Sequence, residues 1–226
     1  PPLFESSDLN VAVNAAIQGA FYSTGQRCTA SSRLIVEEGI YHAFVAAMKD
    51  KLAQIKVGHA LHAGIDIGPV ADQSQLEQDL RYIEIAKNEG ATLAFGGDML
   101  KRDTEGYFLN PALFTDCHPD MVHAREEIFG PVASVIPAKN YEHALQLAND
   151  TEFGLTAGIC TTSLKHATHF KRHARAGMVM VNVPTAGVDY HVPFGGTKGS
   201  SYGAREQGSA AVEFFTTMKT SYTFAG

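Results

Sequence analysis

The sequence lacks the features that mark membrane, secreted and nucleic-acid-binding proteins. It contains no run of about 18 apolar residues, so we expect no membrane span. The opening PPLFESSDLN has neither a basic segment nor an apolar one, so it does not resemble a signal peptide. Lys and Arg number 18 against 24 Asp and Glu, a net charge of −6. Because a phosphate backbone is met by clustered basic residues, this balance argues against nucleic acid as a partner.

Cysteine is scarce, and no metal-ligand pattern stands out. Cys28, Cys117 and Cys160 are far apart and odd in number, which excludes a disulfide framework and suits a reducing compartment, so we expect a cytoplasmic protein. The last two lack basic neighbours, so we expect them to be packing residues. A helix holds three histidines at ligand-like spacing, but neighbouring Lys and Arg residues would repel a cation, so we expect a solvated basic face and no metal at His166, His169 and His173.

What the sequence does contain is typical of a globular α/β protein. The 226 residues are 45% hydrophobic and 19% charged, enough to bury a sizeable core. Apolar periodicity predicts helices at 8–20, 40–55, 74–89, 141–149 and 163–175, and strands at 33–36, 91–95, 132–136, 156–161 and 177–181. Because helices and strands alternate, we expect a largely parallel sheet flanked by helices on both faces.

The connecting and terminal segments carry further predictions. Residues 116–125 read as a polar connection. Residues 182–208 read as a long glycine-rich loop, and loops of this length inside compact domains are usually functional. Residues 214–224 alternate β-forming residues and predict a terminal strand. No following helix covers that strand, so its edge is open to pairing with another chain.

One cysteine lies at a junction between a predicted helix and a predicted strand. Cys28 follows the helix at 8–20 and precedes the strand at 33–36. Gly25 allows the backbone to turn sharply between them. A cation at Arg27 would favour the thiolate, the form that attacks electrophiles. From the residues alone, Cys28 is equally well explained as a small buried hydrophobe, and both interpretations stay open at this point.

Four sequence blocks, in one order along the chain, resemble the aldehyde dehydrogenase superfamily. Gly25–Thr29, GQRCT, is similar to the family's catalytic-cysteine motif. The three further blocks are EEIFGPV at 126–132, NDTEFGL at 149–155, and VPFGGTKGS at 192–200 followed by GARE at 203–206. The resemblance covers nearly the whole chain, and it implies the α/β fold of the family's catalytic domain.

The family's amino-terminal half has no counterpart in this sequence. There is no G-x-G-x-x-G phosphate loop and no E-L-G-G segment with the catalytic base. The chain also opens on Pro1-Pro2 instead of methionine. We therefore expect it to be part of a longer protein: residues 1–213 as the catalytic domain, without most of the cofactor-binding domain, and residues 214–226 as an oligomerisation strand. The resemblance implies a homo-oligomer, dimer or tetramer, joined through that strand.

The resemblance also implies roles for individual residues. Cys28 would be the nucleophile that attacks a small-molecule aldehyde and passes through a thiohemiacetal and a thioester. Glu127 would bind the nicotinamide ribose of NAD or NADP, and Phe129 would pack near the nicotinamide ring. Phe194 would line the substrate tunnel. The alternatives are a loop ion pair between Glu127 and Arg125, and core packing for Phe129 and Phe194.

Arg27 bears on the substrate. A guanidinium directly before the nucleophile can clamp a carboxylate at two points, which suggests a semialdehyde that carries an acid group. Together with GVDYHVPF at 187–194, it resembles the branch that converts 2,5-dioxopentanoate (α-ketoglutaric semialdehyde) to 2-oxoglutarate. The alternative is a structural ion pair that points away from the tunnel.

Three functions therefore remain open. The first is the catalytic portion of an NAD(P)-dependent aldehyde dehydrogenase, inactive on its own. The second is a non-catalytic oligomerisation module that acts through its terminal strand. The third is a related enzyme that passes the acyl group to coenzyme A. The choice between NAD and NADP depends on residues of the absent half.

Overall fold

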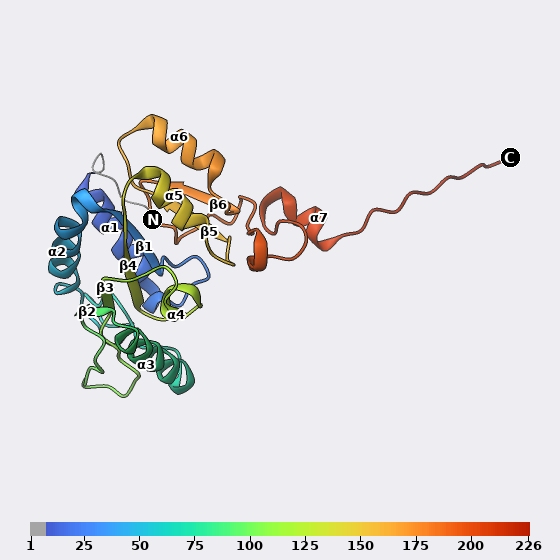
Figure 1. Cartoon of the computed structure of the whole chain (residues 1–226). Coiled ribbons are helices and arrows are strands. Elements are labelled where there is room, and N and C mark those ends of the chain that lie inside the picture. Colours follow the sequence, from blue (N-terminus) through green and yellow to red (C-terminus); the bar gives the residue numbers. More distant parts are fainter. Residues whose placement is uncertain (1–7) are drawn as a thin grey trace.

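The computed structural model of the chain describes residues 8–226. Helices and strands alternate along most of it, as the sequence predicts (Figure 1). No helix in this range is long and apolar enough to cross a lipid bilayer. The helices are α1 (Leu9–Ala20), α2 (Tyr41–Leu52), α3 (Gln73–Asn88), α4 (Val122–Arg125), α5 (Tyr141–Asn149), α6 (Leu164–His173) and α7 (Ala211–Phe215). The strands are β1 (Arg33–Glu37), β2 (Thr92–Phe95), β3 (Ala112–Thr115), β4 (Val132–Ala138), β5 (Thr156–Ile159) and β6 (Met178–Val181).

Four strands form the larger sheet, in the order β1-β4-β3-β2. Strand β4 runs parallel to both β1 and β3, whereas β2 is antiparallel to β3 at one edge. Strands β5 and β6 form a second, two-stranded parallel sheet. The prediction of an α/β fold with largely parallel strands is therefore confirmed.

Helices cover both faces of the larger sheet, and successive side chains of β1 and β4 therefore enter two different cores. On β1, Leu34 and Val36 pack in the core formed with α1 and α2. Ile35, between them, packs in the core formed with α3 and α5. On β4, Val135 and Ile136 divide between the two cores in the same way. A strand that is apolar on both faces is the pattern expected of a covered parallel sheet.

Local signals set several helix ends. Asp8 caps α1 by accepting the backbone N–H groups of Asn10 and Val11, and Ser163 caps α6 by accepting that of His166. Past the end of α3, Gly90 adopts a left-handed φ of 94°. Each of these residues lies next to the helix end that it sets.

Two segments differ from their predictions. The polar connection at 116–125 contains α4, whose first N–H, that of Val122, donates to the Glu89 carboxylate at 2.9 and 3.0 Å. The cap therefore comes from 33 residues away and leaves no local signature. The predicted terminal strand is wrong at its start, because Phe214 and Phe215 belong to α7. Residues 216–226 pair with no strand of the described chain, and they extend away from the folded body (Figure 1).

Candidate active site

Sheet topology brings two distant loops together. The loop that carries Cys28 leads into β1, and the loop at 126–130 leads into β4. The two strands are parallel neighbours, with Arg33 opposite Ser134. Because the amino ends of parallel neighbours lie at the same edge of a sheet, the two loops meet there.

Gly25 lies where these loops touch. Its φ is 66°, and a Cβ at this position would overlap the carbonyl oxygen of Gly130. The two residues before it, Ser23 and Thr24, also have left-handed φ angles, of 54° and 59°. The backbone thus turns sharply after α1, as predicted, and the turn is shaped by close contact with the neighbouring loop.

The three cysteines differ in access to solvent. Cys28 is exposed, whereas Cys117 and Cys160 are buried. Burial raises the pKa of the Cys117 thiol to about 12 and also raises the pKa of Cys160. The packing role predicted for these two is confirmed, and the interpretation of Cys28 as a buried hydrophobe is wrong.

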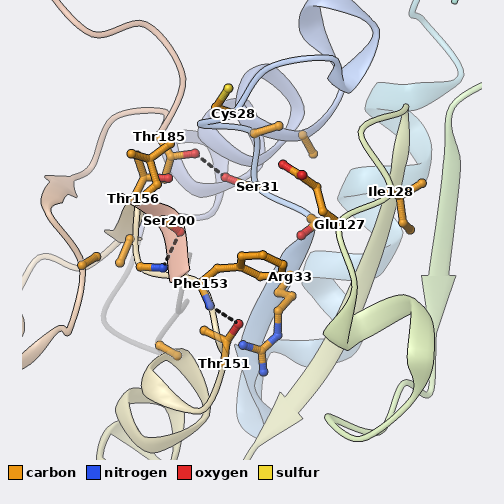
Figure 2. A pocket seen from close by; sticks show the side chains of 18 of the residues that line it. Cys28, Ser31, Arg33, Glu127, Ile128, Thr151, Phe153, Thr156, Thr185 and Ser200 are labelled. Carbon is orange, nitrogen blue, oxygen red and sulfur yellow. Dashed lines mark hydrogen bonds between the residues drawn. The ribbon is translucent and has the colours of Figure 1, made fainter. Parts of the chain in front are cut away.

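A cavity of about 410 Å³ joins most of the predicted site residues. Cys28, Arg27, Glu127 and Phe129 all line it. Figure 2 shows Cys28 and Glu127 on the same pocket, each from a different loop. Cys28 and Glu127 are exposed, and Phe129 is half-buried with a left-handed φ of 60°. An exposed carboxylate and a half-buried aromatic ring on one cavity suit a ribose diol and a flat heteroaromatic ring, so these residues fit a nicotinamide nucleotide.

Phe194 is the exception among the predicted residues. It does not line this cavity, and its backbone forms an isolated bridge with Glu206 (Glu206 N to Phe194 O, 2.8 Å). Besides Phe129, the phenylalanine that lines the cavity is Phe153, in the NDTEFGL block (Figure 2). The tunnel role of Phe194 stays a prediction.

Arg27 contacts backbone and not a carboxylate. Its Nη2 donates to the carbonyl oxygen of Gln18, in the last turn of α1, at 2.6 Å. No ion pair to Arg27 is found in residues 8–226, so the structural ion pair considered for it is not seen. Partial burial lowers the pKa of the guanidinium. Its role as a substrate clamp stays a prediction.

The ion pair considered between Glu127 and Arg125 is also not seen. Arg125 instead binds Asp120 at 2.8 Å and Asp150 at 2.9 Å. These two carboxylates raise the pKa of Arg125, and Arg125 lowers that of Asp150. Glu127 therefore stays available at the rim of the cavity.

Two buried hydroxyl groups fix the cysteine loop to the loop at 182–208. Thr185 Oγ1 donates to the Thr29 carbonyl oxygen at 2.8 Å, and Ser31 Oγ lies 2.6 Å from the same Thr185 oxygen (Figure 2). Since a hydroxyl has one proton, Ser31 must be the donor to Thr185. The pairing spans 154 residues, so nothing local in the sequence indicates it.

Histidines, cysteines and carboxylates do not gather into a metal site in the part of the chain that the structure describes. On α6, the rings of His169 and His173 stack at 3.8 Å. His166 stacks on Tyr141 at 4.3 Å, and His169 hydrogen-bonds the Tyr141 hydroxyl at 2.7 Å. These rings form a stack against α5 and do not converge on one point.

The chain is similar to known proteins along nearly its whole length. A profile of the Aldehyde dehydrogenase family matches residues 3–221. The alpha-ketoglutaric semialdehyde dehydrogenase of Bacillus subtilis is 44% identical over 218 residues, and the 2,5-dioxopentanoate dehydrogenase of Saccharolobus solfataricus is 41% identical over 219. Each alignment covers 96% of this chain and 45% of the relative, so the chain spans less than half the length of these proteins.

Solved structures show the same relationship. The betaine aldehyde dehydrogenase of Staphylococcus aureus in complex with NAD+ superposes with a TM-score of 0.90 at 32% identity, covering 95% of this chain and 42% of that one. HpcC from Thermus thermophilus gives 0.90 at 37% identity, covering 100% and 46%. Sequence and fold together establish that the chain belongs to the aldehyde dehydrogenase family.

Proposed function

We propose that this chain supplies the nucleophile and part of the nicotinamide site of an NAD(P)+-dependent aldehyde dehydrogenase. The observation that carries the proposal is the shared cavity. An exposed thiol at Cys28, an exposed carboxylate at Glu127 and the ring of Phe129 reach it from two loops about a hundred residues apart in sequence.

The chemistry begins at the sulfur. The Cys28 thiolate attacks the aldehyde carbon and forms a thiohemiacetal, and the backbone N–H of Cys28 donates to the developing oxyanion. Glu127 would hold the nicotinamide ribose by accepting from its hydroxyls, and Phe129 would pack near the nicotinamide ring. NAD(P)+, when bound, supplies the hydride acceptor. Oxidation of the carbon leaves a thioester on Cys28, and hydrolysis releases the acid.

For the substrate we propose a semialdehyde that bears a carboxylate, with 2,5-dioxopentanoate preferred. Arg27 lines the cavity beside Cys28 and uses one donor on Gln18, which leaves further N–H groups of its planar fork. The names of the relatives from Bacillus subtilis and Saccharolobus solfataricus support the same substrate.

The nucleophile can be tested on the 226-residue chain, because an activated ester needs no cofactor. Treatment with p-nitrophenyl acetate should add one acetyl group, which peptide mass spectrometry locates at Cys28 and which Cys28→Ser abolishes. Cys117→Ser serves as the matched control and should leave acetylation unchanged. Equal acetylation of all three cysteines would sink the assignment.

The dehydrogenase activity of the chain alone gives a second test. Because the chain spans less than half the length of its relatives, we propose that it shows little or no turnover by itself. The assay follows reduced nicotinamide by absorbance, with 2,5-dioxopentanoate and either NAD+ or NADP+. Robust oxidation by the 226 residues would contradict this proposal.

We also propose that the chain assembles as a cytoplasmic homo-oligomer through its carboxyl-terminal segment. Residues 216–226 lie apart from the folded body and carry large exposed apolar side chains (Figure 1). Three free thiols support the reducing location.

A further inference from the structure

One face of α3 forms hydrogen bonds with the loop at 126–130. Gln75, Gln78, Asp79 and Tyr82 are spaced three, four and seven residues from the first, so they share a side of the helix. The amides of Gln75 and Gln78 both donate to the carbonyl oxygen of Ile128, each at 2.9 Å. The Tyr82 hydroxyl donates to the Glu126 carboxylate at 2.6 Å. This loop carries Glu127 and Phe129, the two side chains proposed to bind cofactor.

Asp79 is the buried member of that face. Its side chain is fully enclosed, at 0% exposure, and lies against Gly130 so closely that a Cβ there would overlap the carboxyl group. Its Oδ1 accepts from the Gln75 amide at 2.8 Å. Its Oδ2 has no hydrogen-bond partner among residues 8–226. Gly130 therefore packs directly against the Asp79 carboxyl group.

No cation among residues 8–226 forms an ion pair with this carboxyl group. Arg81, two residues further along α3, lies over the Tyr82 ring at 5.6 Å, and Arg125 on α4 is held by Asp120 and Asp150. Of the titratable groups on α4 and the loop at 126–130, Glu126 is bound to Tyr82, His123 is paired with Glu89, and Glu127 lies at the cavity. None forms an ion pair with Asp79 in the described chain.

A buried carboxylate without a partner cation favours its neutral form. Burial accordingly raises the pKa of Asp79 to about 7, and the hydrogen bond from Gln75 opposes that rise. The group thus gains or loses a proton to solvent near neutral pH, directly beneath the loop.

We propose that Asp79 is a positioning residue whose protonated carboxyl supports the loop at 126–130 and whose ionisation displaces it, so that Glu127 and Phe129 leave their places at the cavity. The neutral group packs under Gly130 without charge. The ionised group is poorly stabilised there, because its Oδ2 has no hydrogen-bond donor among residues 8–226 and Gly130 is packed against it. The inference rests on the proposed function only in what it says of cofactor binding: the affinity of the site for NAD(P)+ should fall as Asp79 ionises.

The chain has no tryptophan, so Phe129→Trp places a single fluorescent reporter on the loop. Its emission should change with pH around a midpoint near 7. Adding Asp79→Asn, which keeps the shape and cannot ionise, should remove that change. Glu77→Gln is the matched control, because it removes an exposed carboxylate from the same helix and should keep the transition. A transition that persists with Asp79→Asn, or none with Phe129→Trp alone, would overturn the proposal.

If the Phe129→Trp variant fails to fold, hydrogen exchange of the unaltered chain tests the same proposal. Backbone amides of 128–130 are compared with those of Asp79→Asn at the same pH, which cancels the intrinsic pH dependence of exchange. Below neutral pH, these amides should be equally protected from exchange in the two proteins. Above neutral pH, their protection should fall in the unaltered chain and not in Asp79→Asn. Equal protection throughout would refute the switch. Neither readout uses cofactor, substrate or Cys28, so the proposed function can fail while this inference stands, and the reverse.

Discussion

At the scale of single residues, the cysteine loop depends on a hydroxyl pair that lies far from it in sequence. Thr185 satisfies the Thr29 carbonyl and accepts from Ser31, and both hydroxyl-bearing residues are buried. A buried polar group that loses its partner retains the full cost of its desolvation. The loop that presents Cys28 is therefore held by a bond to the 182–208 loop as well as by its own turn.

Thr185→Val tests this dependence, because it keeps the shape and removes the hydroxyl. We expect a loss of about 1–3 kcal/mol in the free energy of unfolding, together with altered Cys28 acetylation, because Thr29 and Ser31 each lose a buried partner. Urea unfolding measures the first effect. Thr168→Val, at an exposed position on α6, is the control and should change stability by less than about 0.5 kcal/mol. Equal effects at the two sites would contradict the role of the hydroxyl pair.

The buried carboxyl group of Asp79 predicts a pH-dependent stability of definite sign. Its pKa rises from 3.8 to about 7 on folding, so the folded state holds the proton more tightly. The stabilising contribution is complete below pH 3.8 and is lost as the pH rises to about 7. The loss is at most about 1.4 kcal/mol for each pH unit in that window.

Urea unfolding of the chain and of Asp79→Asn across this range checks the prediction. As the pH rises to about 7, the free energy of unfolding of the unaltered chain should fall relative to that of Asp79→Asn. Above that pH, the two curves should run parallel. Parallel curves over the whole range would show that Asp79 is ionised in the folded state. A relative stability that increases with pH would mean that its pKa is lowered on folding.

At the scale of elements, the junction between α1 and β1 requires a glycine at position 25, where the backbone touches that of Gly130. Gly25 has a left-handed φ, and any side chain there meets the Gly130 carbonyl. Gly25→Ala therefore adds a steric overlap to backbone strain, and we expect a loss of more than about 3 kcal/mol or failure to fold. Gly64→Ala isolates the strain, since Gly64 has a φ of 79° and open space around it, and should cost only about 1–2 kcal/mol. Thermal melts of the two variants should differ clearly, and coincident melts would refute the overlap.

How much of these elements could be predicted depends on where their determinants lie. Asp8 and Ser163 cap their own helices, so the starts of α1 and α6 could be read from adjacent residues. Helix α4 takes its cap from Glu89, which β2 and β3 separate from it in the sequence. The sequence therefore carries no local signal for this helix. The site divides in the same way. Motif blocks indicated Cys28 and Glu127, whereas Asp79 and Thr185 act through contacts that only folding creates.

At the scale of the whole molecule, the carboxyl-terminal segment has the composition of a strand and no neighbour in its own chain. Met218, Tyr222 and Phe224 are 98%, 95% and 92% exposed. Apolar side chains of this size seldom remain in water unless a partner covers them. A strand also needs an adjacent edge to satisfy its N–H and C=O groups, which explains why alternating β-forming residues produce no strand in the isolated chain.

Removal of residues 216–226 should therefore convert an oligomer into a monomer and leave the cavity intact. Size-exclusion chromatography at several concentrations measures the first effect, since assembly follows mass action. Acetylation of Cys28 controls for folding, because no residue beyond Ser200 lines the cavity. Replacing Lys219 by Ser in the full chain is the matched control and should leave the elution volume unchanged, because it removes a charge from the segment and keeps its apolar residues. An oligomer that survives the truncation would place the interface elsewhere, and an intact chain that elutes as a monomer at every concentration would remove the reason to assign one.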